Sequence, residues 1–204
     1  PTVYVVDDDG DLLRAIGRLL ESAGLRVATF PSAQEFLERY DASGPGCLVL
    51  DLAMPGLSGL ELQRALEQQG SPLPIVFLTG WGDIATSVQA MKHGAADFLT
   101  KPVNDTELIA AIHEALARDQ ALRSARLERE RLAKCLAGLT ERERQVLELI
   151  VAGKLNKQIA AELGTVEKTI KFHRANLMHK MGVRVVVDLV KLAERAGIGS
   201  APRT

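Results

Sequence analysis

Crosslinking and zinc-binding side chains are scarce in this sequence. Among 204 residues there are two cysteines, Cys47 and Cys135, which lie far apart in apolar or helical contexts. Neither has a histidine or a second cysteine at metal-ligand spacing, so the sequence argues against a disulfide framework and against a zinc site. We therefore expect two inert thiols in a reducing compartment.

Long apolar segments are also missing. No apolar run approaches the roughly 20 residues that a helix needs to cross a bilayer. The first residues lack the basic region ahead of an apolar one that marks a secretory signal. With an ordinary globular composition of 47% hydrophobic and 25% charged residues, the expectation is a cytoplasmic protein without a membrane partner.

The net charge of -1 conceals an uneven distribution of charge. Residues 1–120 carry 8 Lys and Arg against 17 Asp and Glu, whereas residues 121–204 carry 17 against 9. An acidic half joined to a basic half suggests two domains with different partners, and the basic half is a candidate for nucleic-acid binding. Two solvated surfaces would give the same charges, so charge alone does not decide between these interpretations.

Short apolar runs alternate with helical patterns through the first part of the chain. The runs predict five strands, at residues 3–6, 26–30, 47–50, 75–78 and 97–99. Three of the intervening helices begin at predicted capping boxes, Ser32/Glu35, Ser58/Glu61 and Asn104/Glu107. Strands that alternate with helices predict an α/β fold with a doubly wound, five-stranded parallel sheet, and active groups gather at the strand C-termini of such sheets.

The rest of the chain is predicted to be helical. Residues 105–136 contain no Pro or Gly, which predicts a helical linker at 119–137, either a solvated helix or a short coiled coil. A capping box at Thr140/Glu143 and glycines at 153 and 164 then divide the sequence into four short helices. We expect an all-α four-helix domain at 138–204 after an α/β domain at 1–118.

Carboxylates follow two of the predicted strands. Asp7 and Asp8 come directly after the first strand, and Asp51 directly after the third. With strand order 2-1-3-4-5 these edges adjoin, so the carboxylates would share a pocket, and their repulsion would need a hard cation such as Mg²⁺. Thr79 ends the fourth strand and Lys101 follows the fifth, where a hydroxyl and an amine suit a phosphoryl group. Singly, each feature is ordinary cap or turn chemistry.

Taken in order, these residues resemble the receiver domain of two-component systems. The resemblance covers about residues 2–118 and includes the segment 51–61, DLAMPGLSGLE. It implies a flavodoxin-like fold in which Asp51 is the phosphorylated residue. It also implies a Mg²⁺ site and a set of switch residues: Asp7, Asp8, Asp51 and the Ala53 carbonyl for the metal, and Thr79, Phe98 and Lys101 for the switch, with the Lys101-Pro102 bond cis.

Phe98 allows two interpretations, and two further positions bear on how long a phosphoryl group would persist. Phe98 is the rotating aromatic by resemblance, although an aromatic at a strand end is often a plain core residue. Ala53 and Trp81 lie two residues beyond Asp51 and Thr79, where side chains control access of water to an acyl phosphate. Since Ala53 cannot position water and Trp81 can shield the site, we expect a long-lived phosphoryl group.

The basic half carries a second motif set. The segments 139–147 (LTERERQVL), 156–160 (NKQIA) and 169–177 (TIKFHRANL) resemble the LuxR-type helix-turn-helix, over about residues 136–200. Joined to a receiver domain, this resembles the FixJ/NarL class of response regulators. The resemblance implies contacts with double-stranded DNA from Asn156, Lys157, Thr169, Lys171, Phe172, His173, Arg174 and Asn176. Phe172 replaces a smaller aliphatic residue; it would either contact a thymine methyl group or shift the docking of the helix, so the target sequence is not readable. Leu155 replaces a serine, which puts the assignment of that helix cap to Asn156 in doubt.

The leading hypothesis is a transcription factor, not an enzyme. A sensor histidine kinase would phosphorylate Asp51. The unphosphorylated receiver would restrain the DNA-binding domain or leave it monomeric, and phosphorylation would favour homodimers on DNA; relief of inhibition and dimerisation could both operate. The apolar helix at 185–196 would provide the dimer contact, or would simply belong to the core. Two other hypotheses remain: a receiver whose basic domain binds a protein or RNA, and a Mg²⁺-dependent phosphatase that uses the acidic cluster.

Overall fold

The computed structural model describes residues 1–42, 44–80 and 94–198. They divide into two compact units, Pro1–Ser124 and Ala125–Thr204, and the division falls within a single helix, α5 (Asp105–Ala137). The predicted helical linker is part of this helix. The domain boundaries predicted at residues 118 and 138 stay predictions.

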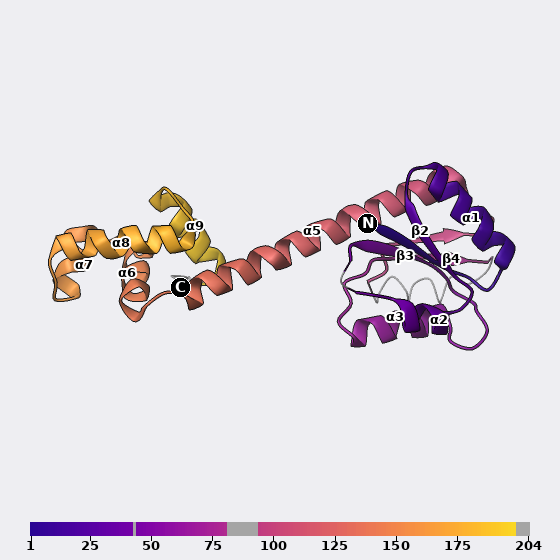
Figure 1. The fold of residues 1–204 in the computed structure, drawn as a ribbon, viewed down its shortest axis with the longest axis horizontal. Helices are drawn as coiled ribbons and strands as arrows, with labels where there is room; N and C mark the ends of the chain where they lie inside the picture. The colour runs from indigo at the N-terminus through magenta and orange to yellow at the C-terminus, as the bar shows by residue number, and fades with distance from the viewer. Residues whose placement is uncertain (43, 81–93, 199–204) are drawn as a thin grey trace, which may run out of the picture. The chain divides into compact units, whose positions relative to one another are not determined.

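A five-stranded parallel sheet forms the centre of the first unit (Figure 1). Its strands are β1 (Thr2–Val6), β2 (Arg26–Phe30), β3 (Gly46–Asp51), β4 (Ile75–Thr79) and β5 (Asp97–Thr100). Each predicted strand agrees with the observed one to within a residue at either end. The order is β2-β1-β3-β4-β5, as predicted, so β1 and β3 are direct neighbours.

Helices cover both faces of this sheet. On one face lie α1 (Gly10–Ser22) and the first part of α5, and on the other lie α2 (Ala33–Arg39) and α3 (Gly59–Gln68) (Figure 1). Successive residues of β3 alternate between two apolar cores, because side chains of a strand point to opposite faces in turn. The helix expected between β4 and β5 lies outside the described residues.

Of the three capping boxes predicted in this part of the chain, Ser58/Glu61 is complete, and for the other two the structure shows the hydrogen bond to the first residue of the pair. The Ser58 hydroxyl accepts from the backbone N–H of Glu61, and the Glu61 carboxylate accepts from that of Ser58, a complete capping box. Ser32 and Asn104 also accept the backbone N–H of the residue three positions on, at 3.2 Å in both cases. Each cap fixes where its helix leaves the sheet edge.

A buried carboxylate joins α5 to the start of β3, a contact that was not predicted from the sequence. Asp119 is 1% exposed; its Oδ2 accepts the Gly46 backbone N–H at 3.0 Å, and both its oxygens accept from Arg123 Nε at 2.9 Å. Gly46 has no room for a side chain, since a Cβ there would lie 2.4 Å from the Thr2 carbonyl oxygen. Asp119 thereby fixes α5 to the first unit at the edge opposite the strand C-termini.

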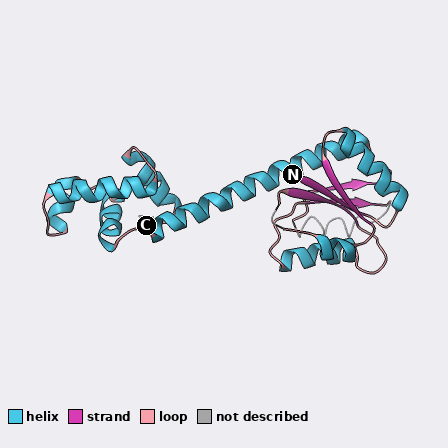
Figure 2. Cartoon of the chain, in the orientation of Figure 1, coloured by secondary structure: helices cyan, strands magenta, loops and turns pink. Residues whose placement is uncertain are grey.

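Helices are the only regular secondary structure in the described part of the second unit (Figure 2). After α5 come α6 (Glu141–Val151), α7 (Asn156–Glu162), α8 (Glu167–Met181) and α9 (Val186–Arg195), which confirms the four predicted helices. They share one apolar core that includes Ile159, Ile170 and Leu177, and Leu132 and Leu136 of α5 pack against it. In the described part of the chain, no helix is both long and apolar enough to cross a membrane.

Glu143 links α6 to α8 from inside this unit. It completes the predicted capping box with Thr140, and its Oε2 also accepts from Lys180 Nζ at 2.7 Å. Burial acts to raise the pKa of Glu143, but the hydrogen bonds from Lys180 and Thr140 outweigh it, so the pKa lies below its ordinary value of 4.5. A carboxyl with a lowered pKa stabilises the folded state only while it is ionised.

We expect Asp119→Ala to lower the free energy of unfolding of the first unit by about 1–3 kcal/mol, because it leaves the buried Gly46 N–H without its acceptor. Thermal unfolding of the full chain, with amide hydrogen exchange at Gly46 as the local measurement, tests this. Asp119→Asn keeps an acceptor oxygen and should lose less. Unchanged protection of the Gly46 amide in Asp119→Ala would contradict the assignment.

The Glu143 network predicts a dependence of stability on pH. Its contribution should be complete above pH 4.5, the ordinary pKa, and should disappear as the pH falls through the lowered pKa of the folded state. Urea unfolding of the wild type and Glu143→Gln should therefore differ most near neutral pH and converge in acid. Glu141→Gln, which removes an exposed carboxylate of the same turn, is the matched control. A difference that stays constant with pH would exclude this role.

Candidate functional site

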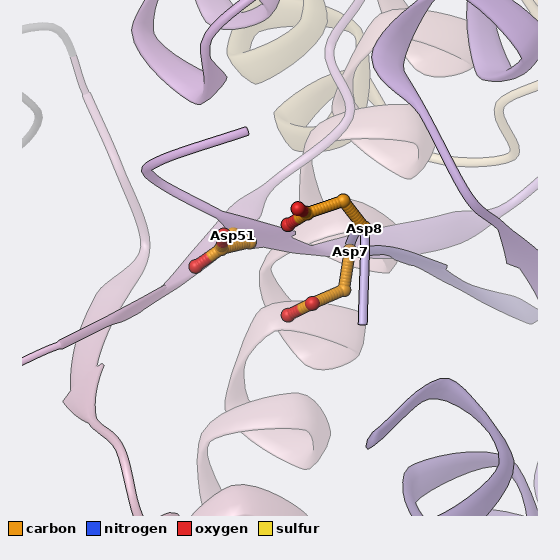
Figure 3. A group of neighbouring side chains, drawn as sticks. All are labelled: Asp7, Asp8 and Asp51. Carbon is orange, nitrogen blue, oxygen red and sulfur yellow. The ribbon is translucent and has the colours of Figure 1, made fainter. Parts of the chain in front are cut away.

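Three carboxylates gather at the C-terminal edge of the sheet (Figure 3). Asp7 and Asp8 follow β1, and Asp51 is the last residue of β3, the strand that lies beside β1. An oxygen atom of each lies within 4.8 Å of an oxygen of the other two. Asp7 and Asp51 are buried and Asp8 is exposed, so the cluster opens to solvent on the Asp8 side.

Adjacent aspartates have different surroundings here. The Asp7 Oδ1 accepts the backbone N–H of Asp9 at 2.9 Å, which holds the chain in a turn as it leaves β1. Asp9 is the N-cap of α1, and its Oδ1 accepts the backbone N–H groups of Asp11 and Leu12. The run Asp7-Asp8-Asp9 therefore supplies two residues to the cluster and one to the helix cap.

Lys101, just after β5, neutralises part of this charge. Its Nζ lies 2.6 Å from Asp7 Oδ2 and 2.9 Å from Asp51 Oδ1. Burial acts to lower the pKa of Lys101, but the bonds to the two carboxylates raise it above its ordinary value, so the amine is held as a cation. Burial raises the pKa of Asp51, Lys101 opposes this, and the charges of Asp7 and Asp8 add to the rise.

The chemistry of this donor set suits a hard divalent cation. One lysine cannot balance three carboxylates, and carboxylate oxygens are the ligands that Mg²⁺ takes in proteins. The Ala53 side chain, two residues beyond Asp51, is exposed. The three predicted acidic metal ligands are thus brought together.

The predicted switch residues lie along β4 and β5. Thr79 is buried at the end of β4, and its hydroxyl donates to the Gly80 carbonyl at 3.1 Å. Phe98 is half-buried and packs against the core on the α2 and α3 side of the sheet. The Lys101-Pro102 peptide bond is cis, as predicted. Trp81, for which a shielding role was predicted, lies outside the described residues.

Close packing behind Asp51 was not predicted. A Cβ on Gly59, the first residue of α3, would lie 2.4 Å from the Asp51 carbonyl oxygen and 3.1 Å from Leu52 Cα. The Gly59 N–H also donates to the Leu52 carbonyl. Glycine is therefore what allows α3 to start directly behind the phosphoacceptor candidate, and a glycine next to a capping serine was the available sequence signal.

A second set of candidate residues lies on α7 and α8. Lys157, Lys171 and Phe172 are exposed, while the other predicted DNA-contacting side chains are half-buried: Asn156, Thr169, His173, Arg174 and Asn176. Arg174 Nη1 donates to Asn156 Oδ1 at 2.8 Å, which ties the start of α7 to the middle of α8. Lys171 Nζ lies 3.1 Å from Glu167 Oε1 on the same helix.

The start of α7 confirms the effect of Leu155. This residue occupies the N-cap position and makes no side-chain cap hydrogen bond. Its backbone N–H instead donates to Gln158 Oε1 at 2.8 Å. Asn156 is the first residue inside the helix, and its side-chain oxygen accepts from Arg174. Asn156 therefore positions Arg174 rather than capping α7.

Comparison with known proteins matches both units. Residues 3–113 match the response regulator receiver domain, and residues 137–193 match the luxR family of bacterial regulatory proteins. The chain belongs to the transcriptional response regulators of two-component systems. The predicted class, a receiver joined to a LuxR-type helix-turn-helix, is confirmed.

Relatives match this response regulator over nearly its whole length. It is 45% identical over 193 residues to the response regulator protein TodT of Pseudomonas putida, covering 95% of this chain and 85% of the relative. It is 43% identical to the transcriptional regulatory protein FixJ of Azorhizobium caulinodans, covering 98% and 94%. A solved structure of the response regulator StyR has a TM-score of 0.89 and 47% identity, covering 96% of this chain and 98% of that one.

We expect Gly59→Ala to displace the end of β3 and to lower the free energy of unfolding by about 1–3 kcal/mol, because the new methyl group would overlap the Asp51 carbonyl. Urea unfolding and the backbone NMR shifts of Asp51 and Leu52 measure both effects. Gly10→Ala is the matched control, since its Cβ meets only Arg14 Nη1 at 3.5 Å. Similar stability and unshifted Asp51 resonances in Gly59→Ala would refute the overlap.

Proposed function

We propose that a sensor histidine kinase phosphorylates this response regulator on Asp51, and that phosphorylation controls dimerisation and DNA binding. The arrangement of the three carboxylates supports Asp51 as the nucleophile. Both oxygens of Asp7 already accept hydrogen bonds, from the Asp9 N–H and from Lys101, whereas Asp51 meets Lys101 through Oδ1. Asp51 is also the residue at the centre of the sheet edge, between β1 and β4.

The reaction is an in-line transfer of a phosphoryl group. A carboxylate oxygen of Asp51 attacks the phosphorus of a phosphohistidine and forms a P–O bond. The P–N bond breaks with its electron pair on the ring nitrogen, and the imidazole leaves neutral because its other ring nitrogen carries a proton. Positioning and charge stabilisation dominate reactions of this kind. The protein acts as the acceptor of one phosphoryl group, not as an enzyme.

A Mg²⁺ ion would be held by Asp7, Asp8, Asp51 and the Ala53 carbonyl. When bound, it would offset the charge of the phosphoryl oxygens. Lys101 provides the fixed cation on the other side. Its ammonium group bridges Asp7 and Asp51 before transfer, within a side chain's reach of a phosphoryl group on Asp51. The charge of the incoming group is therefore met from two directions.

Phosphorylation adds charge and hydrogen-bond acceptors at the end of β3. The Thr79 hydroxyl, which donates to the Gly80 carbonyl, would turn to a phosphoryl oxygen. Phe98 is half-buried on β5, the strand beside that of Thr79, and would move into the space that Thr79 leaves. This changes the surface near β5 and so the contacts available to a second copy of the chain.

The output is DNA binding by the second unit. Its α8 would enter the major groove, with Lys171 and Phe172 toward the bases. The DNA backbone would be contacted by the remaining predicted residues, or by side chains that they position: Asn156, Lys157, Thr169, His173, Arg174 and Asn176. Two valines of the α9 region, Val185 and Val187, are 52% and 62% exposed, which supports a dimer contact there. Bacterial DNA lies in the cytoplasm, so the regulator would act there.

The decisive measurement is the molar mass of the purified full chain by light scattering. With Mg²⁺ and beryllofluoride, a phosphoryl analogue, the wild type should change from monomer to dimer, and Asp51→Asn should not. Asp11→Asn removes an exposed carboxylate from the first turn of α1 and should behave as the wild type. Equal masses for the wild type with and without the analogue, or a dimer of Asp51→Asn with it, would contradict the proposal.

A further inference from the structure

The exposed face of α8 presents an aromatic ring next to cationic side chains. Phe172 is 63% exposed and is the one aromatic residue among the exposed large apolar side chains of the described chain. Lys168 and Lys171 precede it by four residues and one, and Ala175 follows it by three. All three are exposed as well. Lys168 and Ala175 lie one turn away from Phe172 on either side, and neither covers its ring.

The orientation of this ring is constrained on one side. The Phe172 and His173 rings lie 5.9 Å apart between centroids at 65°, an edge-to-face contact. His173 is half-buried and flanks the Phe172 ring on that side. An aromatic side chain with two torsions that is also supported in this way loses little conformational entropy when it is covered.

The charges near the ring favour a polyanion on this face. Lys168 and Lys171 are exposed at its N-terminal side, and the Lys171 ammonium lies 3.1 Å from the Glu167 carboxylate. These groups suit phosphates at the edge of a groove, but phosphate contacts carry no sequence information. A ring in the middle of the same face would meet the base edges instead.

The chemistry of the major groove leaves such a ring one favourable partner. Guanine, cytosine and adenine present hydrogen-bonding groups there, and a phenyl ring would remove their water without replacing it. Thymine also presents its C5-methyl group, which is apolar and projects into the groove. The small Ala175 side chain, on the same helix face, leaves room for this methyl group beside the ring.

We propose that Phe172 is a specificity-determining residue that selects thymine in the operator through its C5-methyl group. The inference rests on the proposed DNA binding by α8 and goes beyond it by naming the base and the atom that are read. Deoxyuridine pairs as thymine does and lacks only this methyl group, so it isolates the contact.

The test starts from an operator obtained by in vitro selection. The full chain, with Mg²⁺ and beryllofluoride, is used to select duplexes from a library with a random central segment, and single thymines of the selected duplex are then replaced by deoxyuridine. At one thymine or more we expect the wild type to bind about 3- to 10-fold more weakly, the effect of one buried methyl group. Phe172→Ala should bind more weakly overall and show no change on the same replacement.

Two further variants separate the contact from general effects. Phe172→Leu keeps an apolar side chain and should retain part of the methyl dependence. Leu127→Ala truncates a side chain that is 66% exposed on α5 and should retain all of it. Thermal unfolding is expected to be similar for all variants, because both sites are exposed.

The remaining outcomes are distinguishable. A selected duplex whose affinity never depends on a thymine methyl, or depends on it equally in the wild type and Phe172→Ala, would overturn the role of Phe172 and leave DNA binding intact. Weaker binding by Phe172→Ala without methyl dependence would indicate insertion between base pairs and would overturn it too. Failure to bind any duplex, selected or random, at low salt would overturn the proposed function itself.

Discussion

The contact of Lys101 with Asp7 and Asp51 is the interaction on which the site depends. Carboxylates come together there because β1 and β3 are neighbours and end at the same edge of the sheet. Their repulsion is tolerable because β5, two strands from β3, ends where a lysine side chain reaches both, at 2.6 and 2.9 Å. The sheet order thus assembles an anionic pocket and its counter-charge from residues that are far apart in the sequence.

That order is in turn maintained by packing on both faces. Alternate residues of β3 enter different apolar cores, one completed by α1 and α5 and the other by α2 and α3. A shift of one residue in β3 would exchange the two sets and move Asp51 off the edge, so the apolar pattern fixes the register and with it the site. Asp119 adds a polar constraint at the other end of the same strand, through the Gly46 N–H.

Most of the fold and the acidic cluster were predictable because both follow from local patterns. Apolar runs, caps and glycines predict the elements. A parallel sheet in which the order of the strands reverses once, between β1 and β3, predicts the edge where Asp8 and Asp51 meet. The missed features are contacts between distant residues: Gly46 and Asp119 are 73 positions apart, and nothing near either signals the other. The tight approach of Gly59 to Asp51 was missed since it depends on the path of α3 and not on a motif.

The three consecutive aspartates after β1 have a consequence for how sequence variation in this chain is to be interpreted. Asp7 is buried against Lys101, Asp8 faces solvent at the cluster, and Asp9 caps α1. Replacements at these positions would look alike in a growth-based screen. Under the proposed function, those at Asp7 and Asp8 would alter the phosphoryl-transfer site, whereas one at Asp9 would alter the amount of folded protein. An assay that measures the abundance of the protein separately from its transcriptional output would distinguish these positions, which are adjacent in the gene but under different selective constraints.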